Sequence, residues 1–155
     1  MIVWRICKRK WASSAFSGQG AAENPGRWNS EGRKAVYFGE SRSLAAWEVL
    51  ANTTSKRSLR HARFVAIPAN VPDDLIVRPS RFPADWDAKP PPDSTRAFGD
   101  RFLTLAKFPV IRLPSVTVRG EFCFLLNPAH PDFAEIAIGK PEPFAFDGRA
   151  VGFSK

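Results

Sequence analysis

Three residues that can act on a charged small molecule follow one another in the first third of the chain. They are Arg27, in the segment 26–29 (GRWN), then Tyr37 and then Glu48. A guanidinium binds phosphate oxygens with its planar fork, a phenol exchanges hydrogen bonds, and a carboxylate stabilises positive charge. Gathered in one place, these groups suit an anionic ligand that develops positive charge as it reacts.

Glu48 is expected on a helix that runs from about Leu44 to Asn52 and is capped by Ser41 or Ser43. It interrupts an otherwise apolar stripe at the helical spacing i, i+3, i+4 and i+7, made of Leu44, Trp47, Glu48 and Ala51. Burying an unpaired carboxylate costs several kcal/mol. Glu48 therefore needs donors, a cationic partner or a wet cleft; a structural ion pair with an arginine is the alternative to a functional role.

The other two residues have both a chemical and a structural interpretation. Arg27 suits a pyrophosphate, or it is an ordinary structural arginine. Tyr37 is the one tyrosine beside 13 phenylalanines, which suggests that its hydroxyl matters, although a strand aromatic that only packs is the alternative.

Ser115 follows Pro114 at the expected end of a strand, where a side chain can face a cleft. No Gly-x-Ser-x-Gly elbow surrounds it, so a covalent nucleophile is not indicated. We expect Ser115 to bind substrate or to orient Arg27 or Glu48, with a simple turn serine as the alternative.

Length and composition favour one globular domain over residues 1–155. The chain is 44% hydrophobic, which argues against disorder. No apolar run reaches the ~20 residues that cross a bilayer, and the start of the chain lacks the features of a signal peptide. We expect a cytoplasmic protein that does not associate with membranes.

Cysteine and histidine give no sign of a metal site. Cys7 and Cys123 form no CxxC pair and are expected to be reduced, buried thiols. His61 and His130 lie far apart and outside any cluster of ligands. The segment 127–132 has turn chemistry, so direct catalysis by His130 is not favoured.

The net charge of +8 has three explanations: nucleic acid, an acidic protein partner, or solubility. The densest basic segments are 8–10 and 56–63. No RNA-binding aromatic motif, helix-turn-helix signature or zinc finger accompanies them. A basic nucleic-acid-binding module is therefore kept as a remoter alternative.

Many short strands, few helices and no regular βαβ alternation predict an α+β fold. Loops are expected at 18–26 and 82–92, a helical turn near 11–16, and a second helix at 95–107 after the one that carries Glu48. Strands are expected at 3–7, 35–38, 63–67 (ended by Pro68), 75–77, 110–113, 122–126, 136–138 and 144–146.

In these motifs the chain resembles the RES domain family, which is named for its Arg, Glu and Ser and supplies the toxin of RES–Xre toxin–antitoxin pairs. Several separate motifs match in order and spacing, which makes the resemblance specific. They are WRI at 4–6, GQGA at 18–21, GRWNSEG at 26–32, VY at 36–37, LAAWEVL at 44–50, LPS at 113–115, LLNPAHPDF at 125–133 and FAFDGR at 144–149.

The resemblance implies an ADP-ribosyltransferase-like fold, with short mixed strands around a cleft, and NAD+ as substrate rather than as a prosthetic group. Family members break the nicotinamide–ribose bond by hydrolysis or phosphorolysis and stop growth by depleting NAD+; protein ADP-ribosylation in the same pocket is the alternative. The implied partner is an Xre-like antitoxin that occludes the active site and supplies any contact with nucleic acid. A homodimer is also implied.

The family also implies roles for individual residues. The implied catalytic residues are Arg27, Tyr37, Glu48 and Ser115. The implied substrate-binding residues are Arg5, Arg27, Trp28, Asn29, Tyr37 and Asn127. The chain departs from the family at Cys123, where an Asn is common, and at Arg119, where a Pro is frequent, and 53–92 matches only loosely. Because nicotinamide leaves as a neutral pyridine, one carboxylate suffices for the chemistry.

Overall fold

A computed structural model describes residues 1–152, with only the backbone described at Lys56 and Arg57. In this part of the chain, eight strands form one sheet in the order β4-β5-β6-β2-β1-β3-β7, and β8 also pairs with β3. Only β4 and β5 run parallel. The strands are β1 (Ile2–Lys8), β2 (Val36–Gly39), β3 (Phe64–Asn70), β4 (Ile76–Val77), β5 (Val110–Pro114), β6 (Phe122–Leu126), β7 (Ala137–Ile138) and β8 (Glu142–Phe144).

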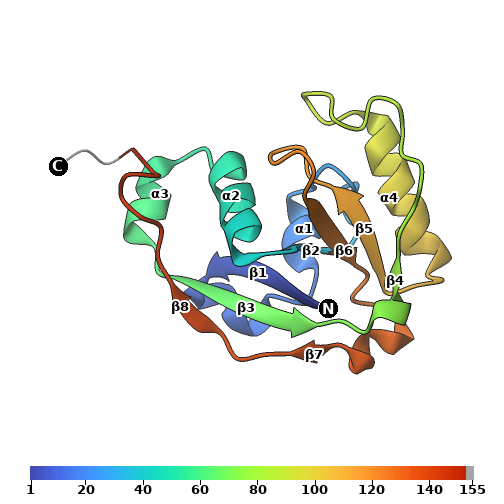
Figure 1. The fold of residues 1–155 in the computed structure, drawn as a ribbon, viewed down its shortest axis with the longest axis horizontal. Coiled ribbons are helices and arrows are strands. Elements are labelled where there is room, and N and C mark those ends of the chain that lie inside the picture. Colours follow the sequence, from blue (N-terminus) through green and yellow to red (C-terminus); the bar gives the residue numbers. More distant parts are fainter. Residues whose placement is uncertain (153–155) are drawn as a thin grey trace.

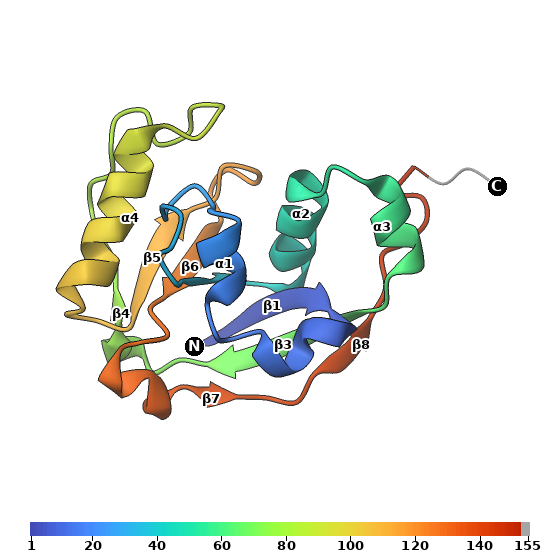
Figure 2. The ribbon, with the colours of Figure 1, turned by 180° about the vertical axis from the view of Figure 1, so that it is seen from behind.

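Two helices stand on the same side of this sheet, as Figures 1 and 2 show: α2 beside β1 and β2, and α4 beside β5. Both were predicted, and Ser41 is the cap of α2, since its Oγ accepts the Leu44 N–H at 3.0 Å. The helices are α1 (Gln19–Glu23), α2 (Arg42–Asn52), α3 (Lys56–His61) and α4 (Asp93–Leu105), with 3-10 turns η1 (Arg9–Ser14), η2 (Asp73–Leu75) and η3 (Pro131–Glu135).

Strand alternation divides the core between the two faces of the sheet. On β2, Val36 and Phe38 join the cluster that contains Phe124 of β6. Tyr37 belongs to the opposite face, where it packs in the cluster formed by α4, β5 and β6. Because Gly39 pairs with Cys123, the face that carries Tyr37 also carries Cys123. This face, between α2 and α4, is where the candidate residues meet.

The predicted end of the third strand at Pro68 is wrong, because β3 continues to Asn70 and Pro68 pairs with Trp4. The Pro68 carbonyl accepts the Gly139 N–H at 2.8 Å, so its nitrogen also points to the outer edge of β3. There β8 pairs only with residues 64–66 and β7 only with 69–70. The missing proline N–H therefore leaves no ladder hydrogen bond unmade.

Two short helices were not predicted, and one strand is displaced. Residues 19–23, expected as loop, form α1, and residues 56–61, for which no element was expected, form α3. The last strand is residues 142–144 rather than 144–146. Helices of five or six residues carry too little periodicity to be recognised, and packing against the sheet stabilises them.

The predicted buried face of α2 is only partly confirmed. Leu44 is 1% exposed, as the stripe predicts, but Trp47 is 51% exposed and Ala51 is exposed. In their place Ala45, Val49 and Leu50 pack in the cluster beneath the helix. The face toward the sheet is thus rotated from the predicted stripe. Glu48 consequently lies at its edge, half-buried, instead of in its centre.

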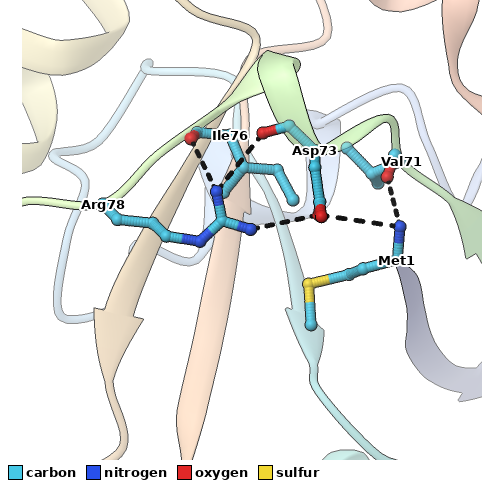
Figure 3. A network of polar contacts seen from close by, with 5 residues as sticks. All are labelled: Met1, Val71, Asp73, Ile76 and Arg78. Atoms are coloured by element: carbon cyan, nitrogen blue, oxygen red, sulfur yellow. Dashed lines mark hydrogen bonds and ion pairs between the residues drawn. The ribbon is translucent and has the colours of Figure 1, made fainter.

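The connection from β3 to β4 is held by a small polar network, shown in Figure 3. The Met1 amine donates to the Val71 carbonyl at 2.6 Å and lies 3.9 Å from the Asp73 carboxylate. Asp73 also pairs with Arg78 at 3.1 Å, and Arg78 reaches the Ile76 carbonyl. The network fastens this connection to the start of β1, and none of the candidate site residues takes part in it.

Candidate active site

Three donors converge on one oxygen of Glu48. Its Oε1 accepts the hydroxyl of Thr117 at 2.7 Å, the hydroxyl of Ser115 at 2.9 Å and the thiol of Cys123 at 3.4 Å. The donors come from the end of β5, the turn after it, and β6, while Glu48 comes from α2. The carboxylate therefore spans from α2 to the β5–β6 hairpin, and its orientation is fixed from the hairpin side.

The second oxygen of Glu48 is much less occupied. Oε2 has one long contact, to the Asn52 amide at 3.4 Å. No ion pair of residues 1–152 includes Glu48, so the structural ion pair considered from the sequence is not found in the described part. A half-buried carboxylate with one anchored and one available oxygen can accept a hydrogen bond from a ligand.

Ser115 is 2% exposed and engaged on two sides. Its Oγ donates to Glu48 and accepts the Val118 N–H at 3.0 Å. The structure thus brings Ser115 into contact with Glu48, which agrees with the prediction that it orients Arg27 or Glu48 and not with the alternative of a simple turn serine. With its proton directed at a carboxylate oxygen and one of its two lone pairs bonded to the Val118 N–H, this hydroxyl orients Glu48.

Thr117 and Cys123 were not among the predicted site residues. Cys123, expected as a buried apolar thiol, instead faces a carboxylate. Burial and then the charge of Glu48 raise the pKa of Cys123, which keeps the thiol protonated and able to donate. The sequence also marked Cys123 as a departure from the family, without indicating a contact to Glu48. For Thr117 the one signal was its position two residues after Ser115 in the same turn.

Arg27 lies close enough to Glu48 for the two charges to interact. Burial lowers the pKa of Arg27, the carboxylates of Asp87 and then Glu48 oppose that change, and the charge of Arg96 adds to it. One nitrogen, Nη1, donates to the carbonyls of Trp86 and Ala88 at 2.9 and 2.8 Å. Arg27 therefore stands where the loop 83–92 approaches the Glu48 side of the sheet.

The same loop is held from the β5–β6 hairpin. Arg119, the second departure from the family, pairs with Asp87 through Nη2 and Oδ2 at 2.8 Å. The arginine is 77% exposed, so this pair contributes little energy. Its effect is on position: it joins the turn that carries Thr117 to the loop that contacts Arg27.

The hydroxyl of Tyr37 builds the segment that carries Arg27. It donates to Asn29 Oδ1 at 2.7 Å and accepts the Trp28 N–H at 3.1 Å, and burial raises the pKa of the phenol. A Cβ added at Gly26 would lie 2.7 Å from that hydroxyl, so a side chain there would displace it. The phenol therefore acts on this segment, in addition to any contact with a ligand.

Three predicted substrate-binding residues have their side chains inside the protein. Trp28 is 4% exposed and packs against Phe82 and Phe98, and Asn29 is fully buried with its amide bonded to backbone carbonyls. Asn127 donates to the Leu103 carbonyl and lies four residues beyond Cys123, about 13 Å along β6. The structure gives no support for direct contact of these side chains with a ligand at Glu48.

Arg5 is a half-buried cation with incomplete hydrogen bonding. Its Nη1 donates to the Tyr37 carbonyl at 3.1 Å, while its Nε has no partner in the described part of the chain. Burial lowers the pKa of this guanidinium, and no carboxylate forms an ion pair with it among residues 1–152. A buried donor without a partner is costly, and an acceptor oxygen at Nε would relieve that cost.

The described residues include no group of three or more His, Cys, Asp or Glu that could hold a metal ion. No helix among them has the length and apolar character needed to span a membrane. A hollow of about 670 Å³ lies elsewhere, against α3 and β8, and none of the predicted site residues lines it.

Comparison with known proteins gives consistent matches. The family model described as "RES domain" matches residues 2–147. "Toxin Res" of Yersinia enterocolitica is 31% identical over 150 residues, which cover 96% of this chain and 99% of the relative. "Prs ADP-ribosylating toxin" of Sphingobium sp. is 32% identical over 155 residues, which cover 96% of this chain and 95% of the relative.

Among solved structures, the chain is similar to a protein in the crystal structure of the M. tuberculosis MbcT–MbcA toxin–antitoxin complex. The TM-score is 0.73 at 16% identity, over 93% of this chain and 84% of that chain. The α+β, ADP-ribosyltransferase-like fold predicted from the sequence is confirmed by this likeness together with the strand order above.

Proposed function

The chain belongs to the RES domain family, and from that premise we propose that it is the toxin of a toxin–antitoxin pair and consumes NAD+ by breaking its nicotinamide–ribose bond. Relatives named as toxins at 31% and 34% identity support the first part. The observation that carries the second part is the state of Glu48, with Oε1 held by three donors and Oε2 available.

The proposed reaction makes one charge that this carboxylate can stabilise. As the bond between the ribose anomeric carbon and nicotinamide breaks, its electron pair leaves with the neutral pyridine, and positive charge develops on the sugar. Glu48 Oε2 accepts a hydrogen bond from a ribose hydroxyl and lies near that charge. Water or phosphate then adds an oxygen to the anomeric carbon, and water gives up a proton in doing so.

The donors around Glu48 make the carboxylate a fixed group. If Oε1 were free, the side chain would have to lose its rotational freedom during the reaction. With Thr117, Ser115 and Cys123 bound to Oε1, that ordering exists before the substrate arrives. Fixed groups that face developing charge lower the barrier without reorganising.

Arg27 supplies a site for the anionic part of the substrate, because it keeps part of its fork beyond the bonds of Nη1. A pyrophosphate oxygen suits that fork. Arg27→Lys keeps the charge and loses the fork, so unchanged NAD+ affinity in that variant would count against this assignment. Arg5 lies two residues from Val3 and therefore on the face of β1 opposite Trp4 and α2, so the register gives no support for its binding the same ligand.

The test is to incubate the purified protein with NAD+ labelled in the adenosine part and to separate the products. Free ADP-ribose indicates hydrolysis, and ADP-ribose phosphate, formed only with phosphate present, indicates phosphorolysis. If NAD+ stays intact with wild-type protein that a melting curve shows to be folded, the proposal is contradicted.

A second candidate is transfer of ADP-ribose to a protein, in the same place and with the same Glu48. It is favoured by one specific observation, the 32% identity to a relative named "Prs ADP-ribosylating toxin". The same incubation separates the two, because transfer puts the label on protein after addition of an acceptor extract.

For the partner, we infer an antitoxin. The similar structure is a toxin–antitoxin complex, which supports a partner of that kind for this chain as well. An Xre-like DNA-binding part, occlusion of the active site, a homodimer and a cytoplasmic location remain predictions from the family and the sequence.

A further inference from the structure

Two adjoining hollows lie at the end of the molecule formed by α3, β8 and η1, which is opposite α4 in Figures 1 and 2. The larger, of about 670 Å³, has an apolar floor that includes Leu59, Phe64, Phe144 and Phe146. The smaller, of about 450 Å³, is lined by Lys8, Arg9, Lys10, Ala62 and Arg63. Since Arg9, Ala62 and Arg63 line both, we call the two hollows together the basic groove.

Every charged side chain that lines the basic groove is positive among the residues that the structure describes. None of these lining residues is Asp or Glu. Among residues 1–152 no ion pair includes Arg9 or Arg63, both of which are exposed. Cations held together without counter-charges repel one another, and an acidic ligand relieves that repulsion. The proposed chemistry at Glu48 uses none of them.

An exposed aromatic stands at the same rim. Trp11 is 50% exposed, and the ammonium groups of Lys8 and Lys10 lie 5.1 and 4.8 Å from its ring centroid. An exposed tryptophan between cations, next to an apolar hollow, combines the residue types that dominate binding energy at protein interfaces.

We propose that the basic groove docks an acidic segment of a protein partner, with carboxylates on Arg9 and Arg63 and an apolar side chain in the hollow above Phe64, Phe144 and Phe146. Charge complementarity selects an anionic partner. The apolar floor selects one that also carries aliphatic or aromatic side chains, since burying them there removes apolar surface from water.

The arrangement of the rings favours a peptide over nucleic acid. Single-stranded nucleic acid needs open ring faces on which bases stack. Phe146 packs edge-to-face on both Phe64 and Phe144, with ring centroids 5.1 Å apart in each pair. The floor of the larger hollow, formed by these packed rings, therefore suits an apolar side chain of a peptide that inserts into it.

The basic groove shares no residue with the surroundings of Glu48. Its lining comes from η1, α3, β3, β8 and the segments beside them, whereas Glu48 is held by the β5–β6 hairpin. Docking there therefore leaves the proposed catalytic residues untouched.

The test measures binding of a fluorescein-labelled peptide, in which glutamates alternate with leucine and phenylalanine, to the full chain by fluorescence anisotropy. The comparison probes are a glutamate–serine peptide of the same charge and a single-stranded oligonucleotide. We expect the first peptide to bind tightest, and its affinity to fall about tenfold for each of Arg9→Glu and Arg63→Glu.

Arg101→Glu is the matched control, because Arg101 is an exposed arginine of α4, which contributes no residue to the groove. It should bind the peptide like the wild type, and all variants should melt at the same temperature and consume NAD+ equally. Equal peptide affinity in the Arg9→Glu, Arg63→Glu double variant would overturn the proposal. So would equal binding of the glutamate–serine peptide, tighter binding of the oligonucleotide, or no binding of any probe.

Discussion

Removing the hydroxyl of Thr117 tests whether anchoring Glu48 matters for the reaction. Thr117→Val keeps the branched shape and deletes the shortest of the three contacts to Oε1, at 2.7 Å. Ser115, which also lies 3.1 Å from the Thr117 hydroxyl, can still donate to Glu48, as can Cys123. The carboxylate thus keeps its charge and two of its three donors.

The magnitude follows from the kind of bond that is lost. A hydrogen bond to a charged group contributes about 1.5–3 kcal/mol, and the half-buried Glu48 belongs at the lower end of that range. A loss of about 1.5 kcal/mol of transition-state stabilisation lowers kcat/KM about tenfold. We expect this in kcat rather than in KM, because the anchored carboxylate acts on charge that exists only in the transition state.

The assay is the initial rate of NAD+ loss over a range of NAD+ concentrations, alongside a melting curve. Thr95→Val is the matched control: it deletes the hydroxyl of a fully buried threonine, which donates to the Pro92 carbonyl at 2.8 Å at the start of α4. It should lower the melting temperature and leave kcat unchanged. A wild-type kcat for Thr117→Val, or an equal loss for Thr95→Val, would refute the reasoning.

Three other outcomes are expected. Glu48→Gln should speed alkylation of Cys123 by iodoacetamide at about pH 9. The Glu48 charge helps to raise the pKa of that thiol, so removing it increases the fraction of reactive thiolate. An unchanged rate would contradict the contact between the two side chains. The contribution of Cys123 to the free energy of unfolding should be fully present below the ordinary thiol pKa of 9.0. It should fall as the pH rises above 9.0, because there the unfolded chain loses the thiol proton and the folded chain, whose thiol pKa is raised, keeps it. Melting curves at alkaline pH should therefore show a shallower loss of stability for Cys123→Ala, and a loss as steep as that of the wild type would contradict this. Gly99→Ala should destabilise the protein by about 3 kcal/mol in urea titration, since the added Cβ would lie 1.8 Å from the Trp28 carbonyl oxygen, and wild-type stability would contradict this packing.

The helix and strand signals that were long and periodic were predictable from the sequence. The helix at Glu48, its cap at Ser41 and the apolar strand at 122–126 are all found. The end of β3 was predicted wrongly at Pro68. A proline ends a strand only where its missing N–H would have made a ladder hydrogen bond, and here the pairing of β7 and β8 leaves that position unpaired. The exposure of Trp47 on α2 could not be predicted for the same reason, because the sheet beneath the helix sets how the helix is rotated about its axis.

The candidate site was predictable in its types of residue and less so in its contacts. Glu48, Ser115 and Arg27 were predicted from motif and position; in the structure Ser115 contacts Glu48, and the charge of Glu48 acts on Arg27. Thr117 and Cys123 were missed, since nothing local marks a hydroxyl or thiol that meets a carboxylate 69 or 75 residues away in sequence. Contacts over such separations come from the fold.

The central claim is that the anchored carboxylate of Glu48 enables the chain to consume NAD+. The most direct measurement is NAD+ concentration in bacteria after induction of the wild-type chain or of Glu48→Gln, which keeps the size of the side chain and removes its charge. The account predicts a collapse of NAD+ with growth arrest for the wild type, and normal NAD+ and growth for the variant at equal protein level. Equal depletion by a folded Glu48→Gln protein would contradict it.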